Sequence, residues 1–137
     1  EGLVPLRRQG HHRDGAVRRM LGGDLPGEPA ANMLNIPVAA YTKGMDIREL
    51  VEMLWIPRLE AFKPEMIFVS AGFDAHRDDD MGQLGLTEND YIWLTERIKD
   101  IARRFSKGRI VSCLEGGYMM GPLSRSVEAH LRVLADV

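Results

Sequence analysis

One stretch of this sequence decides the fold, and it reads MIFVSAGFDAHRDDD over residues 66–80. It begins with an apolar run of strand length. A run that is apolar on both faces is typical of a strand buried between helix layers, as in a parallel sheet. Two ionisable side chains follow, Asp74 and His76. Because ligands bind beyond the carboxyl ends of such strands, these residues are well placed to hold a metal or move a proton.

Strands and helices alternate on either side of this stretch. Before it, residues 34–38 read as a short strand, in which Pro37 favours an edge position or a strand end. A helix capped by Asp46 then carries apolar side chains along one side as far as Phe62. Pro57 lies within it, so we expect this helix to bend there or its first part to end.

The alternation continues after residue 80. Residues 87–90 (TEND) resemble a helix-capping box, and apolar side chains at helical spacing follow as far as Phe105. Residues 109–114 read as another strand, and a last helix carries the stripe Leu123, Val127, Leu131 and Leu134. These units predict an α/β fold with a parallel sheet and right-handed crossovers. Three strands make a narrow sheet, which indicates part of a larger one.

Composition bounds the class of protein. The 137 residues suffice for one domain, and a net charge of −2 indicates neither nucleic-acid nor membrane binding. The single cysteine, Cys113, excludes an internal disulfide and lies in an apolar run, so we expect it to be buried and inert. With no signal peptide or membrane span in sight, a cytoplasmic location is expected. Residues 1–31 lack any apolar period and predict a poorly ordered leader.

A second group of polar residues follows the strand at 109–114. It reads EGGY over residues 115–118. If the two strands are parallel, Asp74 and Tyr118 open on the same rim, where a phenol can stabilise the oxyanion formed during hydrolysis. Gly116 and Gly117 leave space for backbone to approach a ligand. Plainer interpretations are a loop carboxylate and a turn with a packed aromatic, and spacing alone supports only an α/β domain with a rim site.

Three segments in this order resemble the histone deacetylase family. They are VSAGFDAHRDD at 69–79, LT at 86–87 and LEGGY at 114–118. The similarity runs over residues 32–137 and is strongest to the class II-like branch, which includes acetoin-utilisation and acetylpolyamine amidohydrolase proteins. It implies an arginase/deacetylase-type α/β fold, with a parallel sheet flanked by helices. It also implies zinc-dependent hydrolysis of acetyl-lysine or a related acetamide to acetate and an amine.

The resemblance also implies roles for individual residues. Asp74 resembles the last zinc ligand, and Tyr118 resembles the tyrosine that polarises the scissile carbonyl. Gly116 and Gly117 resemble the lining beside the acyl pocket. Zinc with an open coordination position lowers the pKa of bound water and polarises the substrate carbonyl, and the phenol would donate to the same oxygen.

Three further residues take supporting roles by the same resemblance. His76 belongs beside the metal, in its supporting shell or in the pocket wall, because its context matches the third-ligand motif and not the family's Asp-x-His ligand pair. Phe73 is assigned to the substrate pocket. Asp79 resembles an aspartate that ties down the loop.

The chain also departs from the family pattern. Met119 stands where the family has asparagine, and Asp80 where it has proline. The upstream part, with tandem histidines and the Asp-x-His pair, is missing, and we interpret His11-His12 as a coincidence. We therefore predict the C-terminal portion of a deacetylase domain, weakly active or inactive alone.

Two other functional classes stay open from the sequence. One is a non-catalytic piece that associates through an unpaired sheet edge. The other is a nucleotide-binding module using Gly116-Gly117, which the lack of a Gly-x-Gly-x-x-Gly or Walker motif after any strand disfavours.

Overall fold

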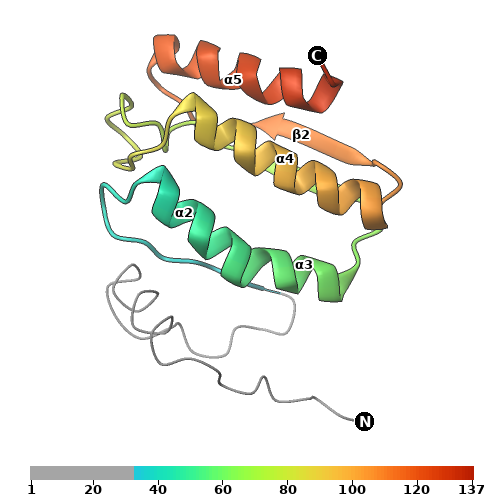
Figure 1. The fold of residues 1–137 in the computed structure, drawn as a ribbon. Helices are drawn as coiled ribbons and strands as arrows, with labels where there is room; N and C mark the ends of the chain where they lie inside the picture. The colour runs from blue at the N-terminus through green and yellow to red at the C-terminus, as the bar shows by residue number, and fades with distance from the viewer. Residues whose placement is uncertain (1–32) are drawn as a thin grey trace, which may run out of the picture. The chain divides into compact units, whose positions relative to one another are not determined.

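The structure is a computed structural model that describes residues 33–137. Residues Ala40–Val137 form one compact unit of helices and two strands (Figure 1). The elements in chain order are α2 (Gly44–Leu50), the π-helical segment η1 (Val51–Trp55), α3 (Ile56–Phe62), β1 (Ile67–Ala71), α4 (Glu88–Phe105), β2 (Ile110–Leu114) and α5 (Met120–Ala135). No helix in this part of the chain is long and apolar enough to cross a membrane.

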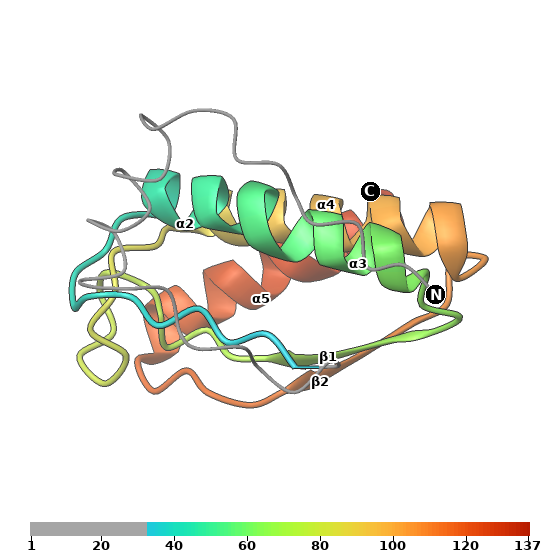
Figure 2. The same cartoon turned by 90° about the horizontal axis from the view of Figure 1, so that it is seen from below.

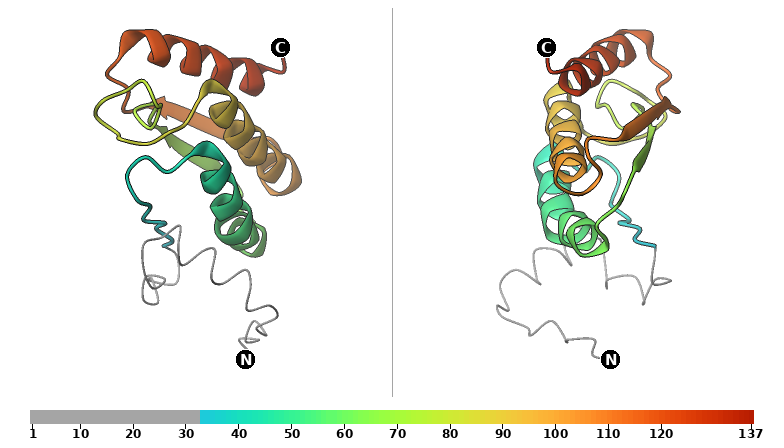
Figure 3. Two further views of the ribbon diagram at one scale, coloured as in Figure 1. Left: turned by 60° about the vertical axis from the view of Figure 1, so that its left-hand side comes forward. Right: turned by 90° about the vertical axis from the view of Figure 1, so that its right-hand side faces the viewer.

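The strands β1 and β2 pair in parallel, with Ile67 opposite Ile110 at the start of the ladder. The helices of the unit lie on one side of this pair (Figures 2 and 3). Exposure alternates along β1, and Phe68, which points to the other side, is 73% exposed. The strand predicted at this place is confirmed, but its burial on both faces is wrong, because residues 40–137 supply a helix layer for one face only.

The helix predicted from Asp46 begins earlier, at Gly44, so Asp46 lies in the first turn and does not cap it. A methyl group on Gly44 would come within 2.2 Å of the Asp90 carboxyl carbon, so glycine lets α2 approach the start of α4 closely. Pro57 lies in the first turn of α3, directly after η1. The chain stays helical from Gly44 to Phe62, so the predicted end of the first part at Pro57 is not seen, and the helix changes instead to π-helical hydrogen bonding over Val51–Trp55.

The longest helix, α4, begins and ends where the sequence predicts. The Thr87 N–H donates to Asp90 Oδ2 at 2.8 Å, which confirms the capping box. Beyond its C-terminus, Gly108 takes a φ of 76°, which suits glycine and lets the chain turn into β2. Tyr91 and Ile101 lie on the buried side of the helix.

The hydrophobic core lies between the helices and the end of β1. One cluster of buried residues in this core comprises Phe73, Leu86 and Tyr91, and the Phe73 and Tyr91 rings have centroids 5.1 Å apart. Leu123 and Val127 of α5 pack against this cluster, as the sequence predicts. The strand ends and the helices therefore share one core, which fixes the loops that follow the strands.

Part of the buried face of α5 is polar. Leu131, predicted on the apolar stripe, is 55% exposed, and His130 beside it is buried instead. The His130 ring bridges two elements, with Nδ1 2.7 Å from Thr95 Oγ1 on α4 and Nε2 2.9 Å from Ser112 Oγ on β2. These two hydrogen bonds turn the helix so that His130 faces the sheet, and the predicted stripe is wrong at Leu131.

The strand predicted over residues 34–38 is also wrong. The structure assigns no helix or strand to residues 33–39. A strand is stabilised by its ladder with a neighbour, and Pro37 has no N–H to donate to one. The predicted leader at 1–31 lies outside the described residues.

Candidate active site

Two loops meet beyond the carboxyl ends of β1 and β2. Their parallel pairing continues past the strands, because the Glu115 N–H donates to the Ala71 carbonyl at 3.0 Å and the Phe73 N–H to the Gly116 carbonyl at 2.7 Å. The segment after β1 is thereby held beside the segment after β2. The prediction that both loops share one rim of the sheet agrees with this geometry.

The carboxylate of Asp74 lies directly over the Cα of Gly116. A methyl group built on Gly116 would come within 2.6 Å of Asp74 Oδ1, and one on Gly72 within 3.0 Å. The space that we expected glycine to leave at this rim is thus filled by the carboxylate itself. The Asp74 side chain is half-buried, so it is neither packed in hydrocarbon nor free in solvent.

The backbone at Tyr118 is held by a buried carboxylate. Asp79 is 5% exposed, and its Oδ2 accepts the N–H groups of Tyr118 at 2.7 Å and Met119 at 3.1 Å. Its Oδ1 accepts the Met81 N–H at 3.0 Å. Burial by itself would raise the pKa of Asp79, but these backbone donors outweigh it and lower the pKa below its usual value. Asp79 is therefore a charged clamp between the two loops.

The side chain of Tyr118 is 60% exposed. Gly117, which precedes it, takes a φ of 134°, and a methyl group there would come within 2.6 Å of Leu123 Cδ1 on α5. Glycine at 117 thus allows the backbone to turn and lets Leu123 of α5 pack closely against it. The backbone of Tyr118 is fixed, while its phenol remains accessible from solvent.

Phe73, which was predicted to line a pocket, is buried among the described residues. Phe73 packs against Tyr91 and, at 5.7 Å between centroids, against His130, so within the described residues its side chain belongs to the core. The Tyr91 hydroxyl donates to the Phe73 carbonyl at 3.0 Å. Burial is the main cause that raises the pKa of Tyr91, and the negative charge of nearby Asp74 raises it further. The Tyr91 side chain on α4 thus holds the Phe73 segment against that helix.

His76 lies under the loop, 1% exposed, and its Nδ1 accepts the Asp78 N–H at 3.0 Å. This burial keeps the ring away from solvent, and the predicted place of His76 beside a metal stays a prediction. Two residues close to it, Glu88 and Arg125, were missed by the sequence analysis. The sequence places Glu88 only within the capping box and assigns no role to Arg125, because nothing in the sequence spacing links either residue to residue 76.

The described residues do not by themselves fit a zinc ion. Across residues 33–137 no group of three or more His, Cys, Asp or Glu side chains could hold a metal. Asp74 offers one partly accessible carboxylate at the rim, whereas a zinc site takes three or four protein ligands. A zinc site at this rim would need ligands from outside the described residues.

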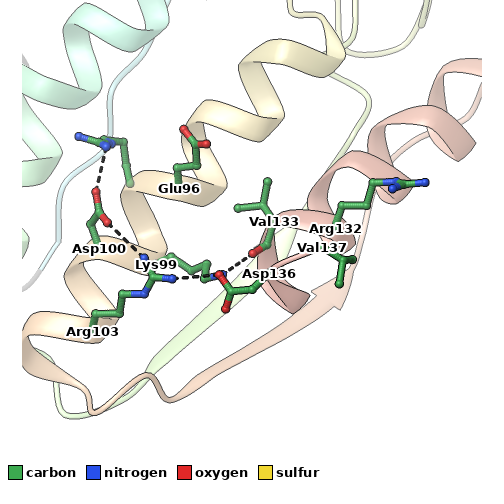
Figure 4. A pocket seen from close by; sticks show the side chains of 9 residues that line it. Glu96, Lys99, Asp100, Arg103, Arg132, Val133, Asp136 and Val137 are labelled. Carbon is green, nitrogen blue, oxygen red and sulfur yellow. Dashed lines mark hydrogen bonds and ion pairs between the residues drawn. The ribbon is translucent and has the colours of Figure 1, made fainter.

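A separate cavity of about 560 Å³ lies along the C-terminal halves of α4 and α5 (Figure 4). Its charged side chains largely satisfy one another. Lys99 donates to Asp136 Oδ1 at 2.6 Å and to the Val133 carbonyl, and Arg103 Nη2 reaches the same Asp136 oxygen at 3.0 Å. The charged side chains that line this cavity therefore form an ion-pair network that holds the end of α5 to α4.

Fold and rim together define a parallel α/β domain with a carboxylate and a phenol at adjacent strand ends. A family model for the histone deacetylase domain matches residues 15–134. The chain therefore belongs to the histone deacetylase family. The match begins inside residues 1–31, whose structure is not described, and the predicted boundary at 31/32 stays a prediction.

Individual relatives agree with this assignment. The chain is 42% identical over 116 residues to type-2 histone deacetylase 2 of Dictyostelium discoideum, covering 82% of this chain and 7% of that protein. It is 37% identical over 108 residues to the chloroplastic histone deacetylase 14 of Arabidopsis thaliana, covering 79% and 26%. The chain thus spans roughly a quarter or less of these relatives.

Solved structures show the same fold. The histone deacetylase Clr3 matches with a TM-score of 0.71 at 29% identity, over 78% of this chain and 18% of that one. The HD domain of HDA15 matches with a TM-score of 0.67 at 29% identity, over 85% and 35%. The predicted arginase/deacetylase-type α/β fold is confirmed, as part of a larger domain.

Proposed function

We propose that this chain is part of a domain that uses zinc to hydrolyse acetyl-lysine or a related acetamide to acetate and an amine. The observation that carries the proposal is the seating of the Asp74 carboxylate on Gly116, two residues before Tyr118. Family membership supplies the reaction class. The geometry supports it by bringing a carboxylate and an accessible phenol to one rim.

Each residue of the rim has a limited role in this proposal. Asp74 offers an anionic oxygen of the kind that binds zinc. Tyr118 donates a hydrogen bond to the carbonyl oxygen as negative charge develops on it. Asp79 acts on neither substrate nor metal, because its carboxylate accepts hydrogen bonds from the backbone N–H groups of Tyr118 and Met119. Substrate choice is proposed to rest on parts of the domain outside the described residues.

The isolated chain is proposed to be weakly active or inactive, because one carboxylate does not hold zinc well. The test follows cleavage of a fluorogenic acetyl-lysine peptide by the 137-residue chain, with chelator and then zinc added. We expect turnover at the level of the zinc-only blank. Robust turnover that chelator abolishes and zinc restores would overturn this part of the proposal.

The catalytic role of the rim is tested in a chimera. Residues 32–137 replace the matching segment of the Arabidopsis thaliana protein, and deacetylation of the same peptide is measured. We expect Tyr118→Phe to lower kcat about 100-fold or more, as for loss of an oxyanion donor. Met119→Leu, which changes the neighbour and leaves the phenol in place, is the matched control. Equal activity of a folded Tyr118→Phe chimera and its parent would contradict the role of Tyr118.

A second candidate is a non-catalytic piece that serves in binding or assembly. The uncovered face of the β1–β2 pair favours it, because the apolar side chains of Phe68 and its neighbour Val111 are left exposed there. Zinc distinguishes the two candidates. A chimera that retains zinc only when Asp74 is present supports the enzyme, whereas retention that is unchanged by Asp74→Asn supports the assembly piece.

A further inference from the structure

His76 holds its loop through one ring nitrogen. Its Nδ1 accepts the Asp78 N–H at 3.0 Å, so the proton of the neutral ring lies on Nε2. The ring is buried between the loop and the start of α4, and its backbone pairs with Leu86 as an isolated parallel bridge. A buried ring N–H needs a polar partner, so the surroundings of Nε2 decide whether this tautomer is stable.

The group that faces Nε2 is the carboxylate of Glu88, the first residue of α4. Glu88 Oε1 lies 3.3 Å from His76 Nε2, which has no well-oriented hydrogen-bond partner among residues 33–137. The negative charge of Glu88 stabilises the Nε2–H tautomer electrostatically. The tautomer of His76 therefore depends on Glu88, a residue that lies beside the ring but comes twelve positions later in the sequence.

Glu88 is in turn fixed by α5. The Arg125 Nε donates to Glu88 Oε1 at 2.6 Å, and this hydrogen bond is the largest cause that lowers the pKa of Glu88 to about 2. Arg125 Nη2 also lies 3.7 Å from Asp78 Oδ2. Arg125 thus touches both the carboxylate that faces His76 and the residue whose N–H His76 accepts.

The other end of this series reaches the rim. The Asp79 N–H donates to the His76 carbonyl at 2.9 Å, and the Asp79 carboxylate accepts the Tyr118 and Met119 N–H groups. The orientation of the His76 peptide therefore sets where the Asp79 carboxylate lies. A change at Glu88 would reach Tyr118 through two intermediate residues.

We propose that Arg125, Glu88 and His76 are positioning residues that set the backbone at Tyr118 through Asp79. The inference rests on the proposed function only for the catalytic role of Tyr118, since none of the three positioning residues touches the candidate rim. The hydrogen bonds themselves are a property of this chain. They are tested on the 137-residue chain without zinc or substrate, so failure here is distinguishable from failure of the proposed deacetylation.

Amide hydrogen exchange followed by NMR gives the test. In Glu88→Ala we expect the amides of Asp78, Tyr118 and Met119 to exchange about tenfold faster or more, because local opening becomes easier. The amides of Ile101 and Ala102, deep in α4, keep their rates. Glu88→Gln retains a carbonyl acceptor for Arg125 and Nε2–H, so it restores slow exchange, although it loses the same charge at the helix N-terminus.

The matched control is Glu128→Ala, which removes the similar but exposed ion pair with Arg132 on α5. We expect no change at Tyr118 or Met119. If amide exchange in Glu88→Ala becomes faster everywhere, Ile101 included, the substitution has lowered the stability of the whole fold. If the exchange rate at Tyr118 is unchanged in Glu88→Ala, Glu88 does not act on the Tyr118 backbone. Either result overturns the proposal, as would a His76 ring with its proton on Nδ1 in the NMR spectrum of the parent chain.

Discussion

The two faces of the β1–β2 pair are built from similar residues and have different surroundings. On the covered face, Val69 and Ser112 lie under the helices, and Ser112 bonds to His130. On the open face, Phe68 stands opposite Val111, and both are exposed. The difference teaches that strand composition shows what a strand can bury, while the topology of this chain decides which side is buried.

The largest expected effect falls on the covered face. His130→Ala removes a buried ring that packs on Phe73, together with the hydrogen bonds that this ring makes with the hydroxyls of Thr95 and Ser112. We expect the free energy of unfolding to fall by about 2–4 kcal/mol, measured by urea denaturation at neutral pH. Leu131→Ala, at the exposed neighbouring position, should cost less than about 1 kcal/mol. Similar losses in the two variants would break the contrast between the faces.

A smaller effect on the covered face depends on pH. The Thr95 hydroxyl donates to the Tyr91 carbonyl at 2.6 Å, so it accepts from His130 Nδ1–H, and Nε2 then accepts from Ser112. Burial lowers the pKa of His130. The unfolded chain therefore binds the extra proton first, and stability falls as pH drops from about 7 to about 5.

Urea denaturation at several pH values measures this slope. His130→Gln, which cannot titrate, should flatten it over the same range. The lowered pKa values of Asp79 and Glu88 act in a more acidic range, because carboxylates titrate near pH 4 in the unfolded chain. A slope that is the same in parent and variant would mean that the buried histidine does not report on the covered face.

The smallest effect on stability is expected on the open face. Phe68→Ser should change the free energy of unfolding by no more than about 0.5 kcal/mol and reduce the binding of an apolar fluorescent dye. Cys113, predicted to be buried, is exposed on this face because β2 has no cover there. Its thiol should react with a disulfide reagent in the folded chain, at a rate that His130→Gln leaves unchanged. A large loss of stability in Phe68→Ser would mean that this face is covered in solution.

Local patterns made most of the fold predictable. The capping box at Thr87 and the apolar period after it placed α4, and the short apolar runs placed β1 and β2 within a residue. Parallel strands also imply adjacent loops, which brought Asp74 near Gly116. These features depend on neighbours in the sequence or on one rule of topology.

The remaining features depend on contacts between distant segments. The start of α2 is set by the fit of Gly44 against Asp90, and the facing of α5 by the bonds of His130 to α4 and β2. The contacts of His76 join a loop to two helices, so no spacing in the sequence reveals them. The positions that the sequence predicted wrongly are mostly those where a polar or small residue is fixed by a remote partner.

The seat of Asp74 on Gly116 constrains how the length of this chain can vary. One residue inserted between 110 and 115 would bring Glu115 under the Asp74 carboxylate, placing two anions in contact and a side chain where there is no room. One residue deleted would bring Gly117, whose backbone is already committed to its turn. Insertions should therefore be tolerated at the exposed Lys107 and Gly108, whereas insertions and deletions should both be excluded from β2.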